Sequence, residues 1–219
     1  MNTIPPPKSV NDLWNRLEEM ERELRFDGRS YPKGMCSFPF KLSGQGFFPG
    51  GDGLWRDLDQ LGAVKDGLLP RSGVVFLGND FGTLQTCNKW KRRGYEIVPT
   101  WKHLKYRIQS AKIPPDKTFF TNAILGLREV GSALDKKCWQ TMASFAQFCG
   151  QFLSYELEVL APKLVVVMGP DARVAFDTLT LNDRPFRVFY TTHPYADFGF
   201  SQNRLTEEIE ALAVAWEKD

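Results

Sequence analysis

The chain has 219 residues, of which 42% are hydrophobic and 25% are charged, and its formal net charge is +2 at pH 7. This length and composition are typical of one soluble globular domain that needs no disulfide bond or metal ion to hold its core together. The small net charge gives no indication of a nucleic-acid partner, so only local clusters of charge can indicate one.

The cysteines and the first residues of the chain narrow the class of protein further. The four cysteines, at positions 36, 87, 138 and 149, form no Cys-x-x-Cys pair, and the chain has two histidines, so we expect no metal site. The segment MNTIPPPKSV contains no apolar signal core, and no apolar run approaches the roughly 20 residues of a membrane helix. We therefore expect a cytoplasmic monomer with reduced thiols and no cofactor.

We expect a single domain over residues 1–219 that begins with a loose tail over residues 1–8. Ser9 is a suitable cap for a helix over residues 10–25, whose apolar side chains recur on one face. Residues 27–55 are rich in glycine and proline and predict a long irregular arm. That arm is either functional, as long loops often are, or a surface connection held by its phenylalanines, and both interpretations stay open.

Four continuously apolar segments predict buried strands, and helical periodicity appears between and after them. The predicted strands cover 74–77, 119–125, 163–168 and 186–191, and the predicted helices cover 137–160, 171–179 and 203–217. This alternation predicts an α/β fold with three α/β/α layers around a central, mostly parallel four-stranded sheet. In such sheets ligands bind beyond the carboxyl ends of the strands. Polar residues lie at or near the ends of three of the four predicted strands. These residues are Asp80, Asn122 and His193.

Four segments resemble the motifs of the uracil-DNA glycosylase superfamily. They are VVFLGNDFG (74–82), FFTNAILGLR (119–128), KLVVVMGPDARVAF (163–176) and FYTTHPYA (189–196), and they occur in the superfamily's order and spacing. The identity within each motif is partial, but all four are in register over residues 74–195. The resemblance implies the superfamily's fold, DNA as partner, and hydrolysis of the bond between a base and its sugar.

The resemblance also implies roles for individual residues. Asp80 matches the acidic or amide position that handles the water, and Asn79 stands where one branch of the superfamily has its carboxylate. Asn122 matches the asparagine that reads the base edge, and His193 matches the histidine that donates a hydrogen bond to the base oxygen. Each of these residues alone could equally have a structural role, as a turn cap, a loop anchor or a satisfied histidine.

Elementary chemistry supports the same roles. Cleavage of the base–sugar bond places negative charge on the leaving base and positive charge on the sugar. A neutral histidine aimed at a base oxygen stabilises the first charge, and a carboxylate near the sugar stabilises the second and positions water. An amide carries both a donor and an acceptor, so Asn122 can distinguish the Watson–Crick edge of a pyrimidine.

Gly78, Phe81 and Gly82 complete the predicted base pocket. Phe81 stands where most members have proline, and it either packs against the base or reshapes the turn. Gly82 stands where the strictly uracil-specific branch has a tyrosine that blocks the C5 position, so the resemblance implies tolerance of a 5-substituted base. The alternative is that Gly82 only provides a positive φ. Tyr95 is predicted to stack on the base, with Trp90 as the alternative.

One branch of the superfamily holds an iron–sulfur cluster with four cysteines. Cys149 matches one of those positions, but Gly126 occupies another and the N-terminal pair is missing. We therefore expect no cluster.

Basic residues are concentrated in residues 89–117, where aromatic residues interleave with them. This local excess indicates a phosphate-contacting surface beside the first motif, although a solvated helix face is the commoner meaning of such a run. The basic residues are Lys89, Lys91, Arg92, Arg93, Lys102, Lys105, Arg107, Lys112 and Lys117. Among them, Lys91, Arg92, Arg93 and Lys105 are the predicted DNA contacts.

The segment after His193 is predicted to contain the side chain that fills the gap left by an extruded base. Tyr195, Phe198 and Phe200 are the candidates, since aromatic groups can replace lost stacking. Core packing of the same loop is an equally good interpretation. Arg204 is predicted to contact phosphate nearby.

The sequence therefore predicts a monofunctional DNA glycosylase that excises uracil or another altered pyrimidine. One alternative is a glycosylase for a bulky modified cytosine in viral DNA, which would act in antiviral defence. Another is a DNA-binding member of the fold without activity. A nucleotide-binding enzyme is disfavoured because neither G-x-G-x-x-G nor a P-loop follows the first strand.

Overall fold

The fold is seen in a computed structural model of the chain. The structure describes residues 8–23, 31–38, 67–93, 99–129, 138–179, 181, 185–195 and 202–218. Residues 1–7 of the predicted tail, most of the predicted arm, and Tyr95, Phe198 and Phe200 lie outside these ranges.

Four parallel strands form the central sheet, as predicted. They are β2 (Val74–Asp80), β3 (Thr118–Ile124), β5 (Leu164–Met168) and β6 (Arg187–Thr191). Their order is β3-β2-β5-β6, and each neighbouring pair is parallel. All four carboxyl ends therefore lie at the same edge of the sheet.

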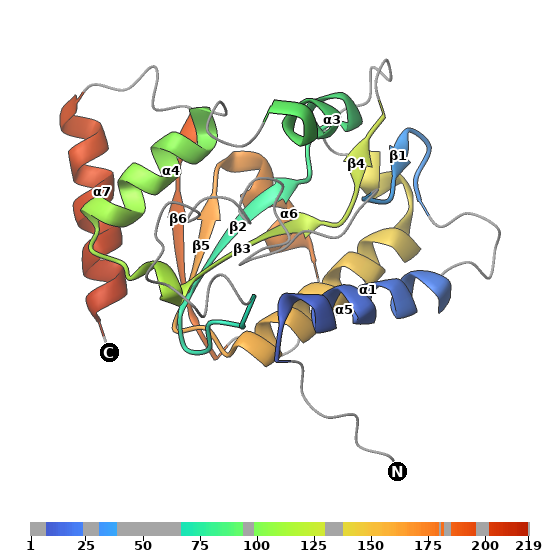
Figure 1. The fold of residues 1–219 in the computed structure, drawn as a ribbon, viewed down its shortest axis with the longest axis horizontal. Coiled ribbons are helices and arrows are strands. Elements are labelled where there is room, and N and C mark those ends of the chain that lie inside the picture. Colours follow the sequence, from blue (N-terminus) through green and yellow to red (C-terminus); the bar gives the residue numbers. More distant parts are fainter. Residues whose placement is uncertain are drawn as a thin grey trace, which may run out of the picture.

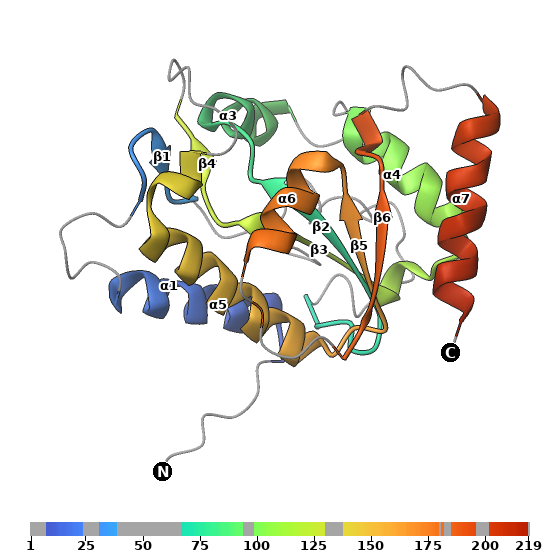
Figure 2. The same cartoon turned by 180° about the vertical axis from the view of Figure 1, so that it is seen from behind.

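Helices cover both faces of this sheet (Figures 1 and 2). The helices α5 (Ala143–Leu160) and α6 (Pro170–Thr178) lie on one face, with α1 (Val10–Glu23) packed beside α5. The helices α4 (Pro99–Ser110) and α7 (Gln202–Glu217) lie on the other face. The predicted three-layer α/β/α fold is confirmed.

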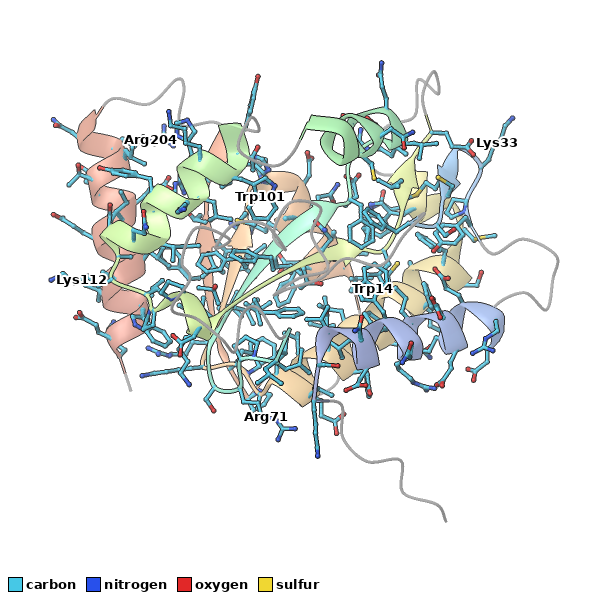
Figure 3. The ribbon with its side chains drawn as sticks, viewed as in Figure 1. Trp14, Lys33, Arg71, Trp101, Lys112 and Arg204 are labelled. Carbon is cyan, nitrogen blue, oxygen red and sulfur yellow. The ribbon has the colours of Figure 1, made fainter. Side chains whose placement is uncertain are left out.

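Alternating side chains of the strands supply two separate cores. Val75 and Leu77 of β2 pack into the core under α1, α5 and α6, whereas Phe76 packs into the core under α4 and α7. Trp14 and Trp101 enter these cores from opposite sides (Figure 3). Residues 74–77 of β2 and 164–168 of β5 are buried on both faces, which explains why these runs are continuously apolar. The buried strand β3 also contains polar residues, Thr118, Thr121 and Asn122.

The predicted helix cap at Ser9 is confirmed. The backbone N–H of Asp12 donates to Ser9 Oγ at 3.3 Å, and the Asp12 carboxylate accepts from the backbone N–H groups of Lys8 and Ser9 at 2.8 and 3.0 Å. These exchanged bonds satisfy N–H groups that a helix start otherwise leaves without partners. The backbone hydrogen bond from Lys8 is the main reason that the pKa of Asp12 is lowered.

Other predicted boundaries were wrong. The helix predicted from residue 137 begins at Ala143 and follows a 3₁₀ turn, η5 (Cys138–Thr141). Two helices were not predicted at all, α3 (Leu84–Arg93) and α4, and a 3₁₀ turn, η4 (Pro115–Lys117), precedes β3. None of the described helices combines the length and the apolar character needed to cross a membrane.

The predicted arm over 27–55 is not irregular throughout. Within it, β1 (Met35–Cys36) pairs antiparallel with β4 (Leu127–Arg128), which follows β3. The backbone N–H of Glu129 also donates to the Gly34 carbonyl at 2.8 Å. This small second sheet places Arg128 beside the end of β2.

Candidate functional site

The four strand exits meet at a switch point of the sheet. The chain passes from β2 to β3 on one side and then returns to β5 and β6 on the other side. The crevice at such a reversal is the usual ligand site of an open parallel sheet. In this sheet the reversal lies between β2, which ends at Asp80, and β5, which is followed by Gly169.

The side chain of Asp80, at the end of β2, is only 6% exposed and is held from three directions. Its Oδ1 accepts from the Gly82 backbone N–H at 2.8 Å, and its Oδ2 accepts from Asn79 Nδ2 at 3.2 Å. The bond from Gly82 closes the tight turn that follows the strand, so the structural role considered for Asp80 is present. A water-handling role for this carboxylate stays a prediction.

Arg128 is a site residue that the sequence reasoning missed. Its Nε lies 2.9 Å from Asp80 Oδ2, and its Nη2 donates a long hydrogen bond of 3.5 Å to Oδ1. The N–H direction at Nε misses hydrogen-bond geometry, so the short approach acts as an ion pair. The pair compensates the negative charge that Asp80 brings into an enclosed position. The only signal in the sequence was a cation at the end of the second motif.

The Asp80–Arg128 pair should stabilise the fold measurably. In a double-mutant cycle with Asp80→Asn and Arg128→Gln, we expect a coupling of about 1–2 kcal/mol in the free energy of unfolding. The exposed pair Arg173–Asp177 is the matched control, with a separation of 3.6 Å, and its coupling should stay below about 0.5 kcal/mol. Equal couplings in chemical denaturation would contradict the assignment.

Asn122 lies inside β3 and is paired in register with Gly78 of β2. Its side chain is fully buried, next to a glycine that leaves space on the neighbouring strand. Phe81 is 1% exposed and packs against Phe38, with ring centroids 5.1 Å apart. Phe81 is thus part of the core, and its contact with a base, like the base-reading role of Asn122, stays a prediction.

Gly82 combines both properties that were considered for it. Its φ is +82°, which favours glycine, and a Cβ added there would meet no other atom within 4 Å. The space beside the turn is therefore open on the side where a larger residue would project.

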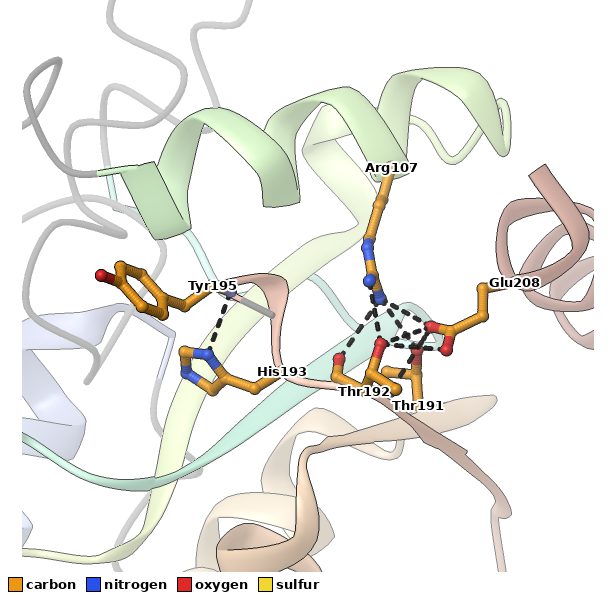
Figure 4. Close-up of polar contacts among 6 residues, drawn as sticks. All are labelled: Arg107, Thr191, Thr192, His193, Tyr195 and Glu208. Carbon is orange, nitrogen blue, oxygen red and sulfur yellow. Dashed lines mark hydrogen bonds and ion pairs between the residues drawn. The ribbon is translucent and has the colours of Figure 1, made fainter. Parts of the chain in front are cut away.

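His193 leans over the end of β5. A Cβ added to Gly169 would lie 2.9 Å from the Cβ of His193, so only glycine allows this approach. The Tyr195 backbone N–H donates to His193 Nδ1 at 3.1 Å (Figure 4). Because a backbone N–H can only donate, Nδ1 is the acceptor, and the proton of the neutral ring lies on Nε2.

Strand β5 lies between β2 and β6, so the ends of β2 and β6 are two strand spacings apart, or about 10 Å. The exit of β5 carries Gly169, which has no side chain to fill this interval. The backbone of the sheet thus brings Asp80, Asn122 and His193 to one edge, with the smallest residue between the carboxylate and the imidazole.

The residues predicted to contact DNA are placed unevenly. Lys91, Arg92 and Arg93 lie on α3, and Lys105 is half-buried on α4. Tyr195 is 61% exposed beside His193. Arg107 was counted in the basic surface, but it is 3% exposed and points inward, so that part of the interpretation was wrong.

A pocket of about 570 Å³ opens beside the β6 exit. Arg204 on α7 and Arg173 on α6 line it, together with Tyr190. Glu207 and Glu208 line the same pocket, so its lining carries both signs of charge, and the phosphate contact of Arg204 stays a prediction.

The described residues contain no group of three or more His, Cys, Asp or Glu side chains arranged to hold a metal ion. Cys149 lies in the core, where the Leu125 backbone N–H donates to its sulfur at 3.5 Å. Burial raises the pKa of this thiol to about 12. A Cβ at Gly126 would lie 2.7 Å from Met35 Cε, so apolar packing fills the place of a second cluster ligand.

No family model matches the sequence, and no curated protein matches it. Among solved structures, the chain is similar to wild-type SMUG2 from Pedobacter heparinus, with a TM-score of 0.47 and 12% sequence identity. The similarity covers 94% of this chain and 97% of that chain. The function of this chain therefore has to be inferred from its own residues.

Proposed function

We propose that the chain is a monofunctional DNA glycosylase that extrudes a uracil or a modified pyrimidine from DNA and hydrolyses its bond to the sugar. The observation that carries this proposal is the hydrogen bond from the Tyr195 backbone N–H to His193 Nδ1. The Tyr195 backbone N–H occupies Nδ1, so Nε2 is the donor of a neutral imidazole at the sheet edge. The motif resemblance over residues 74–195 supplies the reaction class.

Each residue then has one task. His193 Nε2–H donates to the oxygen of the leaving base and stabilises its negative charge. Asp80, paired with the guanidinium of Arg128, stabilises the positive charge of the sugar and orients the attacking water. Asn122 donates to and accepts from the edge of the extruded base.

A product assay on modified DNA tests the proposal. Duplex and single-stranded oligonucleotides containing uracil, 5-hydroxymethyluracil or glucosylated 5-hydroxymethylcytosine are incubated with the wild type, Asp80→Asn, His193→Ala and Asn122→Ala. We expect the wild type to produce abasic sites from at least one of these bases. The excision rate should fall at least 100-fold in Asp80→Asn and in His193→Ala. Binding without abasic product across the panel would refute the proposal. Excision of the glucosylated base would assign the chain to antiviral defence, and excision of uracil alone would exclude that role.

A second candidate function is DNA binding without catalysis. The enclosure of Asp80 favours it, since the carboxylate is 6% exposed and already paired with Arg128. This candidate predicts that Asp80→Asn leaves DNA affinity unchanged and that no abasic product forms. The same assay therefore separates the two functions.

Gly82→Tyr should narrow the range of bases. A tyrosine projects into the open space beside the turn, where a substituent at C5 of the base would lie under the proposed function. We expect kcat/KM for 5-hydroxymethyluracil to fall at least 10-fold more than kcat/KM for uracil. Gly82→Ala is the matched control, because it introduces the same backbone strain at positive φ without the bulk. An equal loss for both bases would show that Gly82 serves the turn alone.

Reversing the charges of Arg92 and Arg93 should weaken DNA binding. Replacing both residues with glutamate removes up to two phosphate contacts, so we expect the slope of log K against log salt concentration to become shallower by about 1–2. Arg16→Glu with Arg22→Glu, both on α1, is the matched reversal and should leave the slope unchanged. If the Arg92/Arg93 variant keeps the wild-type slope, these two residues do not contact DNA phosphates, and the DNA-binding surface lies elsewhere.

A further inference from the structure

A buried arginine lies directly behind the residues that precede His193 (Figure 4). Arg107 of α4 donates from Nη1 to Thr191 Oγ1 at 2.9 Å and to the Thr192 carbonyl at 3.3 Å. Its Nη2 donates to Thr192 Oγ1 at 3.0 Å. One guanidinium thus contacts both side chains and one backbone carbonyl at the end of β6.

Glu208 of α7 meets the same two threonines. Its Oε2 lies 3.0 Å from Arg107 Nη1 and accepts from Thr191 Oγ1 at 2.7 Å. It also accepts from the Thr192 hydroxyl at 2.7 Å and from the Thr192 backbone N–H at 3.4 Å. We call Arg107, Glu208, Thr191 and Thr192 the β6 clamp.

The Arg107–Glu208 pair of the clamp is largely enclosed, with side chains that are 3% and 19% exposed. A buried ion pair often adds little to stability compared with apolar residues of similar volume, because both charges lose their hydration. This pair fixes the orientation of Thr191 and Thr192, since the guanidinium holds its donors in a rigid fork and Glu208 accepts from the opposite side. Seven donor–acceptor contacts within hydrogen-bonding distance converge on two consecutive residues of a strand exit.

The clamped backbone leads directly into His193. The Thr192 carbonyl that accepts from Arg107 belongs to the peptide bond between Thr192 and His193. From the other side, the Gly169 backbone N–H donates to the Thr191 carbonyl at 2.8 Å, and Gly169 contacts the Cβ of His193. The plane of that peptide and the position of the His193 Cβ are therefore both restricted.

We propose that Arg107 and Glu208 are positioning residues that hold the His193 imidazole in the orientation needed to donate from Nε2. The proposal rests on the proposed function for its kinetic consequence, but not for its structural one. Neither residue belongs to one of the four sequence motifs, and nothing in the sequence indicates that either acts on His193.

The charge state of Glu208 suits this role at neutral pH. Burial opposes its ionisation, but hydrogen bonds from Thr191 and Thr192 and the charge of Arg107 outweigh burial and lower its pKa. Glu208 is therefore an acceptor for both hydroxyls throughout the neutral range.

The structural test is the ¹⁵N spectrum of the two imidazoles. The chain contains His103 and His193 only, so His103 serves as an internal reference and His193→Ala gives the assignment. In the wild type we expect one protonated and one accepting nitrogen for His193. Arg107→Lys, Glu208→Gln and Thr192→Val should shift the His193 signals toward a mixture of tautomers and leave those of His103 in place. Arg16→Lys and Glu19→Gln, in the exposed pair of α1, are the matched controls.

The kinetic test uses single-turnover excision of the base that the wild type processes. We expect Arg107→Lys and Thr192→Val to lower the rate constant roughly 10- to 100-fold, because a small displacement of a catalytic group has effects of that size. The KM for DNA should stay within about twofold. Thr192→Ser keeps the hydroxyl and should retain most of the rate, which a general loss of stability would not reproduce.

The outcomes separate the two proposals. Unchanged His193 signals in folded Thr192→Val and Glu208→Gln proteins would overturn the positioning role, whether or not the wild type is a glycosylase. Shifted His193 signals in a protein that excises no base would support the positioning role and refute the proposed function. Thr192→Val changes no buried charge, so it keeps the test valid if Arg107→Lys fails to fold.

Discussion

Gly169→Ala is expected to lower the excision rate about 100-fold and to destabilise the fold by about 1–3 kcal/mol. Its φ of +88° is strained for any residue with a side chain, and the added methyl group would lie 2.9 Å from the Cβ of His193. That atom is part of a restrained backbone segment and cannot swing away like the end of a long side chain. The imidazole must therefore move, and a shift of about 1 Å is enough for a loss of this size.

Gly82→Ala is the control that separates backbone strain at a positive φ from displacement of His193. Its φ of +82° is similar, but no atom lies within 4 Å of the added carbon. Both variants should lose similar stability in chemical denaturation, while only Gly169→Ala should shift the His193 ¹⁵N signals. A Gly169→Ala protein with unshifted His193 signals and full activity would show that the close approach has no functional role.

Glu156→Gln is expected to stabilise the protein at high pH and to change little near pH 5. Glu156 is fully buried on α5, and its carboxyl contacts the Thr121 hydroxyl at 2.8 and 3.1 Å. Burial raises the pKa of Glu156 to about 8 from its ordinary value of 4.5, although the hydrogen bond from Thr121 opposes the rise. The folded protein thus keeps a proton that the unfolded chain releases.

The direction of the pH effect follows from this difference. Between about pH 4.5 and pH 8 the unfolded state binds fewer protons than the folded state, so the free energy of unfolding falls as the pH rises. Each unit of pKa difference corresponds to about 1.4 kcal/mol, which makes the total effect several kcal/mol. Glutamine does not ionise and removes this decline.

Urea denaturation of both proteins from pH 5 to pH 9 measures the effect. The stability difference between Glu156→Gln and the wild type should grow with pH and level off above about pH 8. Glu158→Gln, on the exposed side of the same helix, is the control. Its free energy of unfolding should change with pH in the same way as that of the wild type. A difference that does not vary with pH would show that Glu156 is ionised in the folded protein.

The sheet could be predicted because β2, β3 and β5 are buried along most of their length and consist largely of apolar residues. The predicted starts of β2, β3, β5 and β6 agree with the structure within one residue. The end of β2 could not be predicted, since Gly78 breaks the apolar run and the strand continues to Asp80 only through pairing with β3. Such pairing depends on a partner more than 40 residues away.

The helix α4 was missed although its signal is present. Trp101, Leu104 and Ile108 recur at helical spacing and are all buried. The lysines and arginines between them drew attention to a phosphate surface instead. Arg107 shows the difficulty most clearly, because no local pattern distinguishes an exposed arginine from one that is paired with Glu208, 101 residues away.

The places of the motif residues on the sheet could be predicted from the sequence, but the partners of their side chains could not. Asp80, Asn122 and His193 lie at one edge of the sheet because parallel strands share the direction of their ends. Arg128 comes from a two-residue strand that pairs with Met35–Cys36, and strands this short leave no periodicity in the sequence. Contacts between segments distant in sequence therefore supply what the motifs leave out.

The helix α4 has one side toward solvent and the other toward the β6 clamp. Tyr106 is 48% exposed, whereas the next residue, Arg107, is buried. If DNA docks on the outer side, one helix contacts both the DNA and the clamp that precedes His193. The free energy of DNA binding and the orientation of the imidazole are then thermodynamically linked. Linkage of this kind governs binding and not rate constants, so the nearly constant KM expected for the clamp variants would mean that the coupling between DNA docking and the clamp is small.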